Sequence, residues 1–96
     1  MSMKESYEKK LQAQLDEWSA DIDKLKARAD KAEANVQIAY YKQVDELRSM
    51  QKAASQKLAD LKDAGDDAWE DLKTGIEKTW DKLGHELKSA FSRFKQ

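Results

Sequence analysis

The chain has no cysteine, no proline and only three glycines among its 96 residues. Without cysteine it cannot form a disulfide framework, a thiolate zinc site or a cysteine nucleophile. Glycine and proline are the residues that most often interrupt helices, so their scarcity favours long helical segments. We therefore expect one all-α domain spanning residues 1–96.

The chain also lacks an excess of either charge and any long apolar run. Eighteen Lys and Arg residues face nineteen Asp and Glu residues, which gives a formal net charge of −1. Because binding to a nucleic-acid backbone needs a basic excess, we expect no nucleic-acid partner. No segment approaches the roughly 18 apolar residues of a membrane span, and residues 1–5 lack the apolar core of a secretory signal. The sequence predicts a cytoplasmic protein.

The N-terminal part of the chain carries a heptad-like apolar pattern. Its apolar residues alternate in steps of four and three: Leu11, Leu15, Trp18, Ile22, Leu25, Ala29, Ala32 and Val36. Charged residues of both signs fill the positions between them, as on a solvated helix flank. This spacing is typical of a coiled-coil seam, and a plain amphipathic helix in a bundle would show it equally well.

From Leu25 onward the apolar period changes to 11 residues. The series runs through Leu25, Val36, Leu47, Leu58, Trp69, Trp80 and Phe91. The C-terminal third gathers its large apolar residues in one arc of roughly 100° on a helical wheel. This stripe comprises Trp69, Leu72, Ile76, Trp80, Leu83, Leu87, Phe91 and Phe94. It indicates a helix that packs on a core, or alternatively one that lies on a lipid surface.

The sequence predicts one break between helices, at Gly65. Gly65 can adopt the left-handed conformation that ends a helix, and Asp67 with Glu70 resembles a capping box. We expect a long helix over about residues 6–64, a turn at 65–66 and a second helix over 67–94. A helix of that first length would extend about 87 Å at 1.5 Å per residue, so it needs a second chain to cover it.

An alternative is a bend near residues 35–41 that closes a three-helix bundle within one chain. That bend would make Val36, Ile38, Tyr40 and Tyr41 a buried corner. We rank it behind the oligomer. The expected fold class is thus all-α, a long amphipathic helix followed by a shorter one, forming an elongated coiled coil or helical bundle that is oligomeric.

The sequence offers little catalytic or metal chemistry. His85 is the only histidine, and neither a catalytic triad nor a His-Glu-x-x-His motif surrounds it. The acidic residues between Asp60 and Asp71 lack the ligand spacing of an EF-hand, and helix capping accounts for most of them. We expect no enzymatic activity, no catalytic residues, no cofactor and no metal site.

Three segments carry a resemblance to known proteins. Residues 9–18, KKLQAQLDEW, residues 40–47, YYKQVDEL, and residues 65–72, GDDAWEDL, together resemble small bacterial coiled-coil-domain-containing proteins of uncharacterised function. The 11-residue register of residues 69–94 is similar to the amphipathic repeats of exchangeable apolipoproteins. The first resemblance implies an elongated helical fold, and the second implies reversible coating of a lipid surface.

We therefore predict a non-enzymatic helical interaction protein that self-associates and scaffolds a partner. The alternative is a peripheral lipid-binding protein that uses its C-terminal amphipathic helix. The predicted interaction seam comprises Leu11, Leu15, Trp18, Ile22, Leu25, Val36, Trp69, Leu72, Ile76, Trp80, Leu83, Leu87, Phe91 and Phe94. The expected partners are a second copy of the chain, another protein or a lipid surface.

Overall fold

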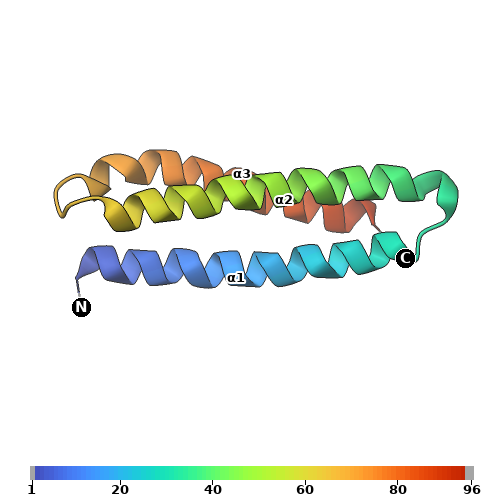
Figure 1. Ribbon diagram of the computed structural model, residues 1–96, viewed down its shortest axis with the longest axis horizontal. Helices are drawn as coiled ribbons and strands as arrows, with labels where there is room; N and C mark the ends of the chain where they lie inside the picture. The colour runs from blue at the N-terminus through green and yellow to red at the C-terminus, as the bar shows by residue number, and fades with distance from the viewer. Residues whose placement is uncertain (1, 95–96) are drawn as a thin grey trace.

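The computed structural model describes residues 2–94, which form three helices in an up-down-up bundle (Figure 1). Helix α1 spans Met3–Asp30, α2 spans Ala34–Asp63 and α3 spans Trp69–Arg93. Helices α1 and α3 run parallel to each other, and α2 runs antiparallel to both. The bundle measures 51 × 20 × 18 Å. The predicted all-α, elongated architecture is confirmed.

The apolar stripes of the three helices meet in one hydrophobic core. No polar or charged side chain is buried among residues 2–94. The core contains Leu11, Leu15, Ile22, Leu25 and Ala29 of α1, Val44, Leu47, Ala54, Leu58 and Leu61 of α2, and Trp69, Ile76, Trp80, Leu83, Leu87 and Ala90 of α3, with Phe94 beyond its end. Burial of these stripes is the main source of stability in an amphipathic bundle.

The expected continuous helix over residues 6–64 is wrong, because the chain folds back between Asp30 and Ala34. Lys31, Ala32 and Glu33 form the connection. These residues favour helix intrinsically, but such a preference amounts to a few tenths of a kcal/mol per residue, about 0.7 at most. Folding back instead buries the apolar stripes of α1 and α2 against each other, and tertiary burial outweighs local propensity.

Side chains of α2 close this turn onto the end of α1. The Gln37 side-chain amide donates to the carbonyl oxygens of Ala29 and Asp30, at 3.1 and 3.3 Å. The Tyr41 hydroxyl donates to the Asp30 carboxylate, and this hydrogen bond lowers the pKa of Asp30. The bend lies a few residues before the alternative position at 35–41. Of the four residues of the predicted corner, Val36 and Ile38 are exposed, whereas Tyr40 and Tyr41 are partly buried against the core.

The predicted break near Gly65 is confirmed, whereas its predicted capping is wrong. No residue in the described part of the chain has a positive φ, so Gly65 is not left-handed. Its carbonyl oxygen accepts from the backbone N–H groups of Ala68 and Trp69, at 3.1 and 3.2 Å. Helix α3 begins at Trp69, two residues later than expected, and no side chain caps it. The tight backbone turn takes the place of the expected Asp67 cap.

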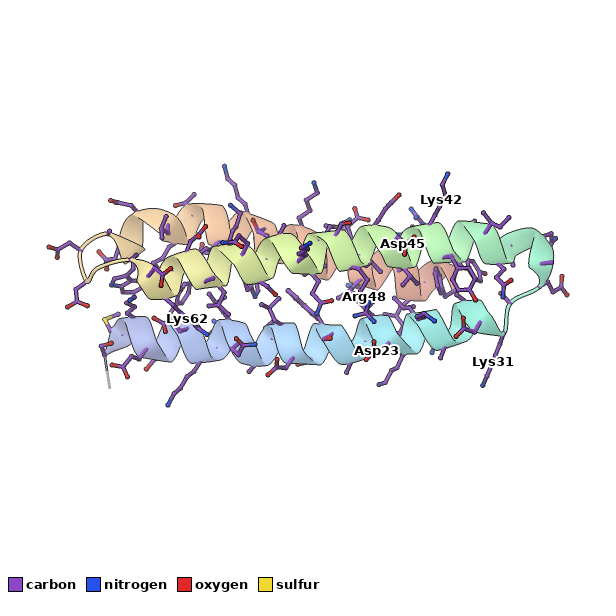
Figure 2. The ribbon with its side chains drawn as sticks, in the orientation of Figure 1. Asp23, Lys31, Lys42, Asp45, Arg48 and Lys62 are labelled. Carbon is purple, nitrogen blue, oxygen red and sulfur yellow. The ribbon has the colours of Figure 1, made fainter. Side chains whose placement is uncertain are left out.

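Polar contacts on the surface tie α1 to α2 along their whole length. Lys4 donates to the Lys62 carbonyl oxygen at 3.1 Å at one end, and Tyr41 contacts Asp30 at the other. Near the middle, Arg48 of α2 reaches across to Asp23 of α1 (Figure 2). These contacts are consistent with the register that the buried apolar stripes of α1 and α2 define.

Candidate interaction surface

Most of the predicted seam lies inside the bundle of a single chain. The buried members are Leu11, Leu15, Ile22, Leu25, Trp69, Ile76, Trp80, Leu83, Leu87 and Phe94. Each is covered by the other two helices of the same chain, so the two predicted stripes need no second copy to leave water. Self-association through them stays a prediction.

Four predicted seam residues lie at the margin of this core. Trp18 and Phe91 are half-buried against it, whereas Val36 and Leu72 are both 36% exposed. Val36 follows the α1–α2 turn directly, where neighbouring helices give little cover. Leu72 lines a shallow hollow of about 150 Å³ between α2 and α3. The helical period places all four on apolar stripes, but the position of each along the bundle decides its burial.

Helices α1 and α3 leave a groove between them. They contact each other less extensively than either contacts α2. The groove encloses about 460 Å³ and is lined by Tyr7, Lys10, Leu11, Gln14 and Trp18 of α1 and by Glu77, Trp80, Asp81, Gly84 and His85 of α3. At its far end, a Cβ atom on Gly84 would lie 3.2 Å from Cζ2 of Trp18. The glycine therefore allows the indole ring to pack directly on the α3 backbone.

A second hollow of about 330 Å³ adjoins the groove at the start of α1. The rings of Tyr7 and Trp69 meet there with centroids 5.8 Å apart. The Lys73 ammonium lies over both rings, 5.4 Å from the Tyr7 centroid and 5.1 Å from that of Trp69. Such cation–π contacts place a positive charge on an aromatic surface. We refer to the two adjoining hollows together as the α1–α3 groove. Its lining residues extend from Met3 to His85.

Two polar atoms beside this groove lack hydrogen-bond partners. Tyr7 Oη and Trp80 Nε1 are both buried and unpaired among residues 2–94. Burial, and secondly the Glu77 carboxylate, raise the pKa of the Tyr7 hydroxyl. Buried donors are nearly always paired in folded proteins. Both unpaired donors belong to residues that line the groove.

The groove contains residues that the sequence reasoning missed. Tyr7 lies before the first seam residue, and Gln14 lies between two of them. Gly84 offered a signal, because an isolated glycine within a helical pattern often marks a close approach. His85, expected on the surface, is exposed at the edge of the groove.

Neither a cluster of metal ligands nor a membrane-spanning helix lies among residues 2–94. Among them, no three His, Asp or Glu side chains gather as metal ligands. None of the helices formed by residues 2–94 has the length and apolar character to cross a membrane. No protein-family model matches the chain, and neither a curated protein nor a solved structure matches it. Its function must be inferred from the surface of the bundle.

Proposed function

We propose that this chain is a non-enzymatic helical interaction protein that holds an amphipathic helix of a partner protein in the α1–α3 groove. The observation that carries this proposal is the incomplete packing between α1 and α3. A fourth helix in the groove would complete a four-helix bundle, in which the helices pack around a shared apolar core. We keep the cytoplasm, expected from the sequence, as its proposed location.

The residues of the groove suit the binding of a helix. Aromatic side chains such as Trp18 and Tyr7 supply large contact area at low entropic cost, and such residues dominate binding energy at interfaces. Lys10 on one rim and Asp81 on the other offer charges of opposite sign. A complementary partner would carry an apolar stripe flanked by an acidic residue on one side and a basic residue on the other.

Site-specific photo-crosslinking tests this proposal. In one variant p-benzoylphenylalanine replaces Gln14, which lines the groove, and in the control it replaces Lys52, which is exposed on α2. We expect Gln14 but not Lys52 to yield a discrete crosslinked partner in cells, with the crosslink on an amphipathic helix. Equal labelling from both positions, or no product from Gln14, would contradict the proposal.

A second candidate function is reversible lipid binding by α3. Of the three helices, α3 has the most one-sided apolar stripe, and residues 64–68 form its only covalent link to the bundle. Opening at that link would turn the stripe towards a bilayer surface. This function requires the core to be exposed, whereas binding in the groove does not.

Vesicle flotation distinguishes the two functions. If α3 opens onto lipid, the protein floats with anionic vesicles and, to a lesser degree, with neutral ones. Tryptophan emission alone is a weaker probe of lipid binding. Trp69 and Trp80 are only 6% and 7% exposed in the bundle, so their emission should change little when the rings move from the core into lipid. A protein that stays at the bottom of the gradient under both conditions would exclude lipid coating and leave the groove as the binding surface.

A further inference from the structure

We propose that the α1–α2 connection, Lys31–Glu33, is a hinge through which two copies of the chain exchange α1. In the exchanged dimer α1 and α2 of each copy form one continuous helix, and α1 packs on α2 and α3 of the other copy. The proposal goes beyond binding in the groove, and it does not depend on it.

The connection departs from helix at Glu33 but scarcely at Lys31. Lys31 has φ −96° and ψ −4°, which is close to helical, whereas Glu33 is extended with φ −63° and ψ 149°. Because the φ of Glu33 already suits a helix, rotation about its ψ accounts for much of the change at that residue. Lys, Ala and Glu are among the better helix formers, and the connection contains no glycine or proline. Nothing in its local chemistry requires the turn.

The apolar pattern also continues through the connection. Ala29, Ala32 and Val36 keep the four-and-three spacing of the α1 stripe across the turn. In the closed chain Val36 is nonetheless 36% exposed. In a continuous helix these residues would share one face. The exchanged dimer would have a two-fold axis beside this face, so the same face of the second copy can cover it.

In a continuous helix, backbone donors can replace the Gln37 side chain at the end of α1. In the closed chain Gln37 donates to the carbonyl oxygens of Ala29 and Asp30. In a continuous helix the backbone N–H groups of Glu33 and Ala34 would donate to those oxygens. The start of α2 has no side-chain cap, so straightening the connection breaks none there.

The rest of the bundle can re-form between chains. When α1 is exchanged, each half of the dimer contains α1 of one copy with α2 and α3 of the other. The helix directions within each half are the same as in the single chain. The Asp23–Arg48 pair and the contact from Lys4 to Lys62 then form between copies. Exchange of identical contacts is a low-cost route to a dimer. Each half also repeats the α1–α3 groove, so the dimer would bind two partner helices at once.

The second connection has a different character. The carbonyl oxygen of Gly65 accepts two backbone N–H groups, and the acidic residues Asp66 and Asp67 follow it. Glycine costs about 1 kcal/mol within a helix relative to alanine. A continuous helix is therefore favoured at Lys31–Glu33 over residues 64–68, which selects α1 as the exchanged element.

Proline at position 34 tests the hinge directly. Ala34 is the first residue of α2, and the residue before it is already extended, so proline fits the closed chain. In a continuous helix the same proline would clash with the carbonyl group of Asp30 and remove a hydrogen bond. We expect Ala34→Pro to lower the dimerisation constant by more than about a hundredfold, measured by light scattering after refolding at high protein concentration.

Two further variants make this measurement specific. Ala34→Ser, which both forms tolerate, should dimerise like the wild type. Gln37→Ala combined with Tyr41→Phe removes the side-chain bonds that close the turn, so it should raise the dimer fraction several-fold. A dimer that persists in Ala34→Pro would overturn the proposal. So would the absence of any dimer in both the wild type and the double variant.

Crosslinking distinguishes exchange from simple side-by-side association. The chain has no native cysteine, so Asp23→Cys in one copy and Arg48→Cys in another would carry the only thiols. After the two are refolded together, a short bismaleimide should join position 23 of one copy to position 48 of the other. A dimer without this crosslink would overturn the exchange. The monomeric Ala34→Pro variant keeps its groove, so photo-crosslinking through Gln14 tests the proposed function separately.

Discussion

Leu72 and Leu83 lie on the same apolar stripe of α3 but differ in burial. Leu83 is fully buried between the helices, whereas Leu72 is 36% exposed. The sequence places both on one face through the helical period. It does not indicate which positions along the stripe face a neighbouring helix and which face its margin. Burial is decided at this scale by the other two helices, not by the residue type.

Truncation of these two leucines should therefore have unequal effects. We expect Leu83→Ala to lower the free energy of unfolding by about 2–5 kcal/mol, because it removes buried methyl groups and leaves a cavity. Leu72→Ala should cost less than about 1 kcal/mol, since most surface substitutions have small effects. Urea unfolding followed by circular dichroism measures both. Equal losses would show that Leu72 is covered in solution, for example by a second copy.

At the scale of helices, the sequence predicts helix content and the break near Gly65 correctly. It fails at Lys31–Glu33, because those residues have the same local preferences as the helices around them. Only the burial gained when the α1–α2 hairpin closes distinguishes a turn there from a continuous helix. The sequence does not predict the groove for a similar reason. Trp18 and Gly84 lie far apart in sequence and meet only through the parallel packing of α1 and α3.

Two glycines of α3 differ in how closely neighbouring side chains pack on them. Nothing lies within 4 Å of a Cβ atom placed on Gly75, whereas one on Gly84 would lie 3.2 Å from Trp18. Gly75→Ala should raise the free energy of unfolding by about 0.5–1 kcal/mol, because alanine favours helix. Gly84→Ala should gain less, since the Trp18 ring must move aside. Thermal unfolding compares them, and an equal gain would show that the Trp18 contact is loose.

The molecule as a whole is long and thin for its mass. Its radius of gyration is 15.5 Å, compared with about 12–13 Å for a typical compact domain of this length. It exposes 6478 Å², whereas a typical folded protein of 11.1 kDa exposes about 5,700 Å². The stability of the bundle thus depends on a narrow core that is apolar throughout the described residues. Its many charges lie outside that core.

Salt should consequently have little effect on the stability of the bundle. Among the described residues the ion pairs Lys26–Asp30 and Arg48–Asp23 are well exposed to solvent, and Lys4–Glu8, within one turn of α1, is partly covered. Raising NaCl from about 0.01 M to about 1 M shortens the Debye length from about 30 Å to about 3 Å and screens such pairs. We expect the free energy of unfolding in urea to change by less than about 1 kcal/mol over this range, because exposed pairs contribute little. Arg48→Gln, which removes one pair, should show the same small dependence. A loss of several kcal/mol in the wild type would mean that long-range attraction between charged surfaces, rather than the apolar core, holds the three helices together.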